Sequence, residues 1–332
     1  MHATAEATPN IAVIKYWGMR DSALVLPLNS SISVTMDFSL RTRTRVEFGD
    51  FKKDSAFLNG KELGGDGRTR VLKIINQVRK LACAGEKCRV QSENFFPTKA
   101  GFASSASGFA ALAVAADAAL ALHLGPDALS RLARVSSGSA CRSVLGGFVQ
   151  WNAGEQKNGL DSYAVQLAPA SHWEGLLNIA AVVDAGEKAV GSAEGMQLTV
   201  QTSALFKKRL AELPERTARM EKAIKKRDAH SFFAIAMEES ASMHACMADT
   251  KPPLRYMNNV SREIVRAVES LNKTHGENVC GYTFDAGPNA HVYTTKAHAA
   301  EVKNALSKVA GVQKLFTCGV GEGPRVLEAP AK

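Results

Sequence analysis

The pattern of apolar and polar positions predicts strands over residues 10–48. Residues 11–17 form an apolar run with one lysine in it, and residues 31–48 alternate between the two types. Three arginines recur on one face of the second segment: Arg41, Arg43 and Arg45. We interpret that face as the solvent-exposed side of a sheet.

A hairpin signal and two helical patterns follow. A short strand at 57–59 is closed by an Asn59-Gly60 turn, and residues 68–81 have apolar positions at the spacing of a helix. Residues 88–96 are typical of another strand. A loop rich in glycine, serine and alanine then leads into an alanine-rich helix predicted over 105–124.

Longer helices and fewer strands are predicted in the second half of the chain. Five segments are assigned there: a buried strand at 176–184, helices over 199–210 and 216–247, and strands at 279–284 and 291–294. This order suits an α+β fold with helices on one face of an antiparallel sheet. Because 332 residues exceed the ~250–300 at which a single core stops growing, we expect two lobes with a boundary near residues 168–186.

Composition places the chain among folded soluble proteins. Hydrophobic residues make up 45% and charged residues 22%, close to ordinary globular usage. The longest apolar stretch, 109–116, is far short of the ~20 residues of a membrane span, and the first residues lack the pattern of a secretory signal. We therefore expect a cytoplasmic protein with no membrane span. The 6 cysteines lack the spacing of a zinc site, and we expect buried reduced thiols.

The formal net charge of +9 admits three kinds of partner: nucleic acid, an anionic membrane surface or a small polyanionic substrate. The basic residues are spread along the chain, and the densest cluster, at 225–227, lies in a predicted exposed helix. Charge alone does not choose among the three.

The segment PTKAGFASSASG, at 97–108, has the features of a phosphate-binding loop. Gly101 allows the backbone to approach a ligand, and Ser104, Ser105 and Ser107 lie where a helix begins and its N–H groups are unpaired. Amides, hydroxyls and the helix dipole all favour an anion there. The same spacing is compatible with a serine-capped helix that packs tightly.

Two further segments carry a cation among small or apolar residues. In NIAVIKYWG, at 10–18, Lys15 is costly to bury without a carboxylate or phosphate partner, although its ammonium could reach water from a sheet edge. In SGSACR, at 137–142, the hydroxyls suit a diphosphate and Arg142 suits a planar carboxylate. Another capped helix start is the alternative for this second segment.

An aspartate ends a predicted strand in the segment TFDAGPNAHVY. By turn chemistry alone, Asp285 initiates the Gly-Pro-Asn turn that follows. Because the chain also contains the other polar segments, Asp285 is in addition a candidate catalytic residue.

Seven segments, in this order, resemble the diphosphomevalonate decarboxylases: NIAVIKYWG, LPLNSSISVT, PTKAGFASSASG, SGSACRS, EGMQLTV, PPLRYMN and FDAGPNA. The resemblance runs from about residue 8 to about residue 325. That family belongs to the superfamily of galactokinase, homoserine kinase and the mevalonate kinases. The resemblance implies a two-lobed α+β GHMP-kinase-like fold. Its N-terminal lobe (1–175) is expected to be like the second domain of ribosomal protein S5, and its C-terminal lobe (176–332) to be ferredoxin-like. The active site is then expected in the cleft between the lobes.

The resemblance also implies an activity of the mevalonate pathway. ATP with Mg²⁺, as co-substrate, phosphorylates the 3-hydroxyl of (R)-5-diphosphomevalonate; phosphate and carbon dioxide then leave to give isopentenyl diphosphate. No permanently bound cofactor is expected. The implied partners are these small molecules and a second copy of the chain in a homodimer, and neither nucleic acid nor a membrane span is expected.

Specific residues are implied by the matching motifs. The catalytic set is Asp285, Lys15, Arg142 and Asn10. The substrate-binding set is Tyr16, Trp17, Gly18, Arg68, Ser137, Gly138, Ser139, Ala140, Cys141 and Arg142. The ATP-binding set is Ala100, Gly101, Ala103, Ser104, Ser105 and Ala106, with Ser105 also a ligand of the Mg²⁺ that accompanies the phosphates.

The chain departs from the family pattern in several places. Met19 replaces the lysine of KYWGK, so a cation expected near the substrate diphosphate is missing, and we expect Arg68 to supply it. Other departures are Lys99 and Phe102 in the phosphate loop, Ala193, and a missing insert between residues 312 and 318.

Three rival functions share some of these features. A kinase that stops after phosphorylating mevalonate or its phosphate would use the same loop and aspartate. An RNA-binding protein would suit the charge and an S5-like lobe, but the sequence lacks an aromatic and basic RNA-reading stripe. A scaffold without activity would not need four polar motifs.

Overall fold

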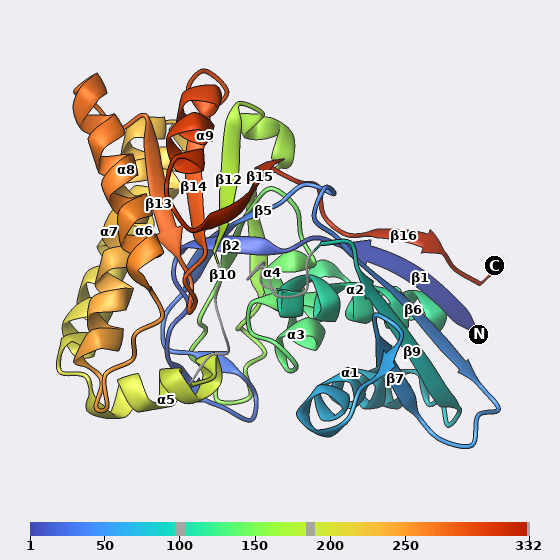
Figure 1. Cartoon of the computed structure of the whole chain (residues 1–332). Helices are drawn as coiled ribbons and strands as arrows, with labels where there is room; N and C mark the ends of the chain where they lie inside the picture. Colours follow the sequence, from blue (N-terminus) through green and yellow to red (C-terminus); the bar gives the residue numbers. More distant parts are fainter. Residues whose placement is uncertain (97–103, 184–189, 331–332) are drawn as a thin grey trace.

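Residues 1–96, 104–183 and 190–330 are described by the computed structural model (Figure 1). The largest sheet has the order β16-β1-β6-β9-β7-β8. Its strands are β1 (His2–Ala7), β6 (Thr42–Gly49), β7 (Ser55–Leu58), β8 (Lys61–Glu62), β9 (Lys87–Asn94) and β16 (Arg325–Glu328). β16, from the far end of the sequence, lies antiparallel to β1.

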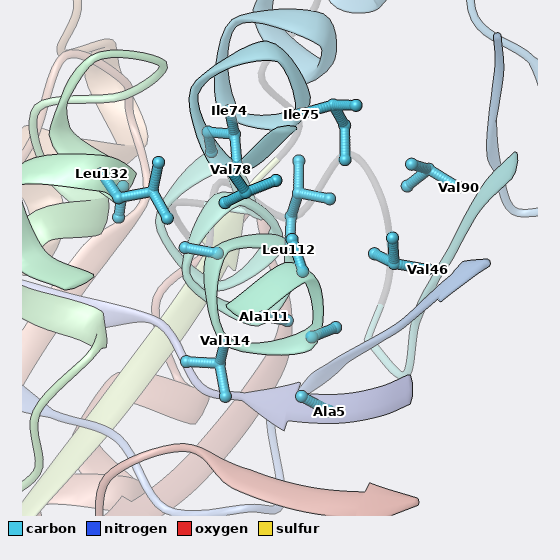
Figure 2. Close-up of a cluster of buried hydrophobic side chains, with 14 of the residues drawn as sticks. Ala5, Val46, Ile74, Ile75, Val78, Val90, Ala111, Leu112, Val114 and Leu132 are labelled. Atoms are coloured by element: carbon cyan, nitrogen blue, oxygen red, sulfur yellow. The ribbon is translucent and has the colours of Figure 1, made fainter. Parts of the chain in front are cut away.

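Two helices, α1 (Gly65–Ala82) and α2 (Ser104–Ala119), cover one face of this sheet. Figure 2 shows the cluster between them, in which Val46 and Val90 of the strands meet Ile74 and Val78 of α1 and Leu112 of α2. Alanine favours the helix and its small side chain lets α2 lie close to the strands. The predicted helix at 68–81 is therefore confirmed, whereas the one predicted over 105–124 ends at Ala119.

The other face of the sheet carries an ion cluster. Glu6 is fully buried and its carboxylate accepts hydrogen bonds from Arg41 Nε at 3.1 Å, Arg43 Nη2 at 2.8 Å and Arg325 Nη2 at 2.7 Å. Arg45 instead pairs with Glu328 of β16 at 2.8 Å. The arginines therefore lie on the solvent-facing side of the sheet, as predicted, but they also form ion pairs there: Arg41 and Arg43 neutralise the buried carboxylate, and Arg45 joins β6 to β16.

A second sheet has the order β11-β10-β5-β2. Its strands are β2 (Asn10–Ile14), β5 (Ser31–Thr35), β10 (Phe148–Trp151) and β11 (Ala164–Ala168), and the short pair β3 (Met19–Asp21) and β4 (Leu26–Pro27) lies apart. The alternating segment 31–48 is thus two strands in different sheets, β5 and β6. The apolar run at 11–17 leaves the sheet after Ile14, which frees the residues that follow to face another element.

The third sheet has the order β13-β14-β12-β15. Its strands are β12 (Leu176–Val183), β13 (Cys280–Phe284), β14 (Ala290–Thr295) and β15 (Val312–Gly319). Helices α8 (Asn259–His275) and α9 (Ala299–Ser307) pack on one face, and α7 (Ala229–Asp249) packs on the other (Figure 1). For this sheet, the prediction of helices on one face alone was wrong.

α7 also joins the second and third sheets. Its Phe232 and Phe233 share one buried cluster with Ile11 of β2 and Val182 of β12. That common core brings the end of β2 near the turn between β13 and β14, which are separated widely in sequence. The remaining helical segments are α3 (Pro126–Arg134), α4 (Ala140–Ser143), the 3₁₀ turn η1 (Ala170–Trp173), α5 (Ser192–Thr202) and α6 (Leu205–Lys226).

Helix ends in the second half differ from the predictions. The helix predicted over 216–247 is interrupted between α6 and α7, where Arg227 has φ +55° and Asp228 accepts a hydrogen bond from the Ser231 N–H as an N-cap. The segment 199–210 spans the end of α5 and the start of α6. α8 was not predicted, although Asn258 and Ser261 form a capping box at its start.

Within the described residues, no helix is long and apolar enough to cross a membrane. All six cysteines are free thiols; five are buried as expected, and Cys83 is exposed.

Candidate active site

One cavity of about 930 Å³ lies where the second sheet, the starts of α1 and α2, α4, α5 and the β13–β14 turn meet. Its volume is in the range of small-molecule sites. Residues from both halves of the chain line it, from Asn10 to His291. A ligand in this cavity would contact both halves at once.

An ion pair from distant parts of the sequence lies in the cavity wall. Lys15, just after β2, donates from Nζ to Asp285 Oδ1 at 2.6 Å. The Lys15 side chain is 2% exposed, whereas that of Asp285 is 42% exposed and faces the cavity. The partner expected for a buried lysine is therefore this carboxylate, which retains a free side for a ligand.

The pair fixes charge at the site. Burial alone would raise the pKa of Asp285, but the Lys15 ammonium outweighs it and holds that pKa below its usual value. Burial lowers the pKa of Lys15, and Asp285 partly opposes this effect. Asp285 is thus a carboxylate at neutral pH and a hydrogen-bond acceptor for any hydroxyl beside it.

Arg142, on α4, is held in the cavity wall by two hydrogen bonds. Its Nε donates to Asn10 Oδ1 at 3.0 Å and its Nη1 donates to Ser31 Oγ at 2.6 Å. Asn10 in turn donates from Nδ2 to Ser143 Oγ at 2.7 Å and to the Ser139 carbonyl at 2.9 Å. The guanidinium is therefore oriented before any anion binds. Asn10 is itself held by Ser139 and Ser143, so it fixes the position of Arg142.

Small hydroxyl residues from two loops meet across the cavity. Ser137 Oγ donates to Ser105 Oγ at 3.4 Å and lies 3.3 Å from Ser139 Oγ. Gly138 between them packs so closely that an added Cβ would lie 2.8 Å from the Tyr16 ring. Tyr16 itself meets Trp151 edge-on at 4.7 Å between ring centroids. The start of α2 and the serine segment before α4 therefore converge on one site.

The first turns of α1 supply cations, but not the one predicted. Arg70 and Lys73 line the cavity, three positions apart on one helix face. Arg70 Nε donates to the Ser136 carbonyl at 2.7 Å, which places α1 against the serine loop. Arg68 is not among the residues that line the cavity and donates to the Asp54 carbonyl at 3.1 Å, so its expected role at the diphosphate stays a prediction. Met19 lines the cavity as an uncharged residue.

Several other predicted residues do not reach the cavity wall among the residues that the structure describes. Ala106, Ala140 and Cys141 are buried in hydrophobic packing, and Gly18 turns the chain with φ +102° against Phe206. Trp17, Ser104 and Ala193 do line it. Five predicted or noted positions lie outside the described residues: Lys99, Ala100, Gly101, Phe102 and Ala103.

Among the cavity residues that the sequence analysis did not predict are Arg70, Lys73 and His291. The first two could have been found from the helical phase, because Arg70 lies four positions before the buried Ile74 on nearly the same side of α1, and Lys73 lies beside it at the border of that side. His291, on β14, is 2% exposed and hydrogen bonds through Nδ1 with Asn178 Oδ1 at 3.0 Å. Burial lowers its pKa to about 4, so the ring is neutral at physiological pH.

Comparison with known proteins gives consistent matches along the whole chain. The family model for the diphosphomevalonate decarboxylase-like N-terminal domain matches residues 7–164, and that for the mevalonate 5-diphosphate decarboxylase C-terminal domain matches residues 178–322. The diphosphomevalonate decarboxylase of Aspergillus fumigatus is 46% identical over 325 residues, covering 93% of this chain and 80% of that protein.

Solved structures agree. The mevalonate diphosphate decarboxylase from Staphylococcus aureus superposes with a TM-score of 0.92 at 35% identity, covering 98% of each chain. A structure described as a complex with MVAPP, AMPPCP and magnesium superposes with a TM-score of 0.90 at 37% identity, covering 99% of each chain. The fold and the order of the site segments are therefore shared with these proteins.

Proposed function

The chain belongs to the diphosphomevalonate decarboxylase family, and from that membership we propose how its cavity carries out the reaction. The enzyme decarboxylates diphosphomevalonate in an ATP-dependent step of the mevalonate pathway. Isopentenyl diphosphate, ADP, phosphate and carbon dioxide are the products. ATP enters with Mg²⁺ as a co-substrate, in line with the related complex that holds AMPPCP and magnesium.

The observation that carries the proposed mechanism is the Lys15–Asp285 pair at 2.6 Å in the cavity wall. The exposed side of the Asp285 carboxylate accepts a hydrogen bond from the substrate 3-hydroxyl. Because its pKa is low, Asp285 is a weak base that orients the hydroxyl and takes the proton only as the oxygen bonds to the γ-phosphorus of ATP. Lys15 stabilises the negative charge that gathers there.

Arg142 holds the substrate carboxylate in the second stage. After phosphorylation the C3–O bond breaks and phosphate leaves with its electron pair. The bond to the carboxylate carbon then breaks, its electrons form the alkene, and carbon dioxide departs. A guanidinium whose Nε and Nη1 are already fixed can offer its remaining N–H groups in one orientation, which keeps the breaking bond aligned.

We propose that the diphosphate and the nucleotide phosphates bind in neighbouring parts of the cavity, which meet where Ser137 faces Ser105. We assign the diphosphate to Arg70, Tyr16, Ser137 and Ser139, with Lys73 supplying the positive charge that Met19 lacks. The ATP phosphates lie near Ser104 and Ser105, at the positive end of α2. The Ser105 hydroxyl, half-buried in the wall and facing Ser137, suits a place in the oxygen shell of the Mg²⁺. That ion would neutralise the transferring phosphate.

Three expectations stay predictions. A division into lobes 1–175 and 176–332 is supported by the limits of the two family models, with β16 as a strand of the second segment that joins the first. A homodimer would be tested by analytical ultracentrifugation, and a cytoplasmic location by fractionation.

The test of the activity is a balance of products. The protein is incubated with diphosphomevalonate, ATP and Mg²⁺ while phosphate and carbon dioxide are measured in the same vessel. We expect the two to appear in equal amounts, with ADP. ADP formation without carbon dioxide would show a kinase that stops at the phosphorylated intermediate.

A further inference from the structure

A buried carboxylate lies behind Lys15, on the side away from the cavity. Glu239, on α7, is fully buried, and its Oε1 accepts a hydrogen bond from the Lys15 backbone N–H at 3.1 Å. We propose that Glu239 is a positioning residue that fixes the backbone and the charge of Lys15 so that its ammonium meets Asp285. This inference rests on the proposed role of the Lys15–Asp285 pair.

The backbone of Lys15 has no strand partner at this point because β2 ends at Ile14. Residues from three other elements take over both of its polar groups. Glu239 binds the N–H, while the carbonyl accepts from Asn29 Nδ2 at 2.9 Å and from Arg209 Nη2 at 3.4 Å. The direction in which the Lys15 side chain leaves the strand is therefore set by these contacts and not by the sheet.

Two arginines hold the Glu239 carboxylate in place. Arg209 Nη2 donates to Oε1, and Arg216 Nη1 donates to Oε2 at 2.8 Å. Both arginines come from α6, and their side chains are 1% and 6% exposed, respectively. A carboxylate with both oxygens occupied by guanidiniums cannot rotate, so the Lys15 N–H meets an acceptor fixed in position.

Charge gives Glu239 a second effect on Lys15. The titratable groups around the ammonium are Asp285, Glu239, Arg142, Arg209, His244 and His291. Burial and Arg142 lower the pKa of Lys15, and the two carboxylates raise it. His244 and His291 add no positive charge near neutral pH, because burial lowers the pKa of each to about 4. Without the Glu239 charge, Lys15 should lose its proton at lower pH.

The neighbouring Glu238 offers a matched control. It also pairs with Arg216, through Nε at 2.8 Å, but its side chain is 41% exposed and it bonds Arg219 rather than Lys15. Glu238→Gln therefore perturbs the same arginine network without touching Lys15.

The experiment compares Glu239→Gln, Glu239→Asp and Glu238→Gln with the wild-type enzyme in the carbon dioxide assay with ATP, Mg²⁺ and diphosphomevalonate. Glu239→Gln should lower kcat by roughly 10–100-fold, as expected for a misplaced reacting group, while KM for ATP changes less than about threefold. The alkaline limb of its kcat/KM profile should move to lower pH. Glu239→Asp keeps the charge with a shorter reach, so it should lower kcat without moving that limb.

Each outcome bears on the proposal. Normal kcat with an unmoved alkaline limb in a folded Glu239→Gln would overturn it, as would an equal shift of the limb in Glu238→Gln. If Glu239→Gln fails to fold, Glu239→Asp with unchanged kcat would overturn it. Lys15→Met and Asp285→Asn are assayed alongside, because activity in those two variants would reject the role of the pair itself and not the part assigned to Glu239.

Discussion

Replacing Arg142 by lysine keeps a positive charge and removes the planar group that the site is built around. The arginine is 2% exposed, lines the cavity and uses Nε and Nη1 on Asn10 and Ser31, which leaves its remaining N–H groups for the proposed bonds to the substrate carboxylate. A single ammonium on a flexible chain can satisfy one of these partners or the substrate, but not all of them.

The size of the effect follows from the bonds that are lost. A hydrogen bond to a charged group contributes about 1.5–3 kcal/mol, and a buried acceptor left without a donor costs about 1–3 kcal/mol. If lysine retains one of the two internal bonds, the free energy of unfolding should fall by ~2–3 kcal/mol. Losing one bond to the substrate carboxylate should lower kcat/KM for carbon dioxide release by about 10–150-fold.

The assay for Arg142→Lys follows phosphate and carbon dioxide in parallel, with urea unfolding on the same sample. We expect carbon dioxide release to fall more than ADP formation, so that the 3-phosphorylated intermediate accumulates. Arg134→Lys is the control, because Arg134 is 3% exposed but binds the carbonyls of Leu24 and Gly159 away from the cavity wall. It should lose stability and keep the product ratio. Equal loss of ADP and carbon dioxide in Arg142→Lys would refute the division of roles.

Three further predictions address the other ends of the site. Asp285→Ala should lower kcat by ~10²–10⁴-fold while the dissociation constant for nucleotide, measured by titration, changes only a few fold; equal losses in both would make Asp285 structural. Arg70→Gln should raise KM for diphosphomevalonate by about 10–150-fold, whereas Arg68→Gln should leave it within about twofold, and the reverse order would contradict the placement of α1. His291, with a pKa of about 4 against about 6.5 when unfolded, gains its proton only on unfolding between these values. The free energy of unfolding of the wild type should therefore fall as pH drops from 6.5 to 4, by up to ~1.4 kcal/mol per pH unit from this group. Urea unfolding of His291→Gln should show a shallower decline with pH. If the decline is as steep as in the wild type, His291 is not a neutral buried ring.

How far the sequence predicts this molecule is clearest at Lys15 and Arg68. An ammonium inside an apolar run needs a counter-charge, so a partner for Lys15 was predicted from the sequence, and it lies 270 positions away in Asp285. Which side of α1 faces the cavity depends on helix phase, and two positions rotate a side chain by about 200°. Arg68 was the cation predicted from the motif, whereas Arg70, two positions later, is the one that lines the cavity. Motif spacing does not resolve that rotation.

Other features had no readable signal in a single chain. Glu239 follows Glu238 in a helix, and nothing in the local sequence tells the buried acid from the exposed one. Glu239 lies on the same helix face as Ala236, Ser240 and Met243, which are buried. Only the helical spacing of these four residues indicates that Glu239 is buried too. The break between α6 and α7 at Arg227 was not predicted either. Glycine is the residue that usually marks a left-handed backbone conformation, and Arg227 adopts that conformation without being glycine.

The pairing of β16 with β1 has a consequence for biosynthesis. β1 is synthesised more than three hundred residues before β16, so the outer edge of the first sheet stays open while the chain between them is made. During that time Glu6 lacks Arg325, one of the guanidiniums that neutralise it. An unpaired edge strand is a template for association with other chains. The nascent protein therefore passes through a long interval in which β1 must be kept from neighbouring chains, and that interval closes only when β16 pairs with it.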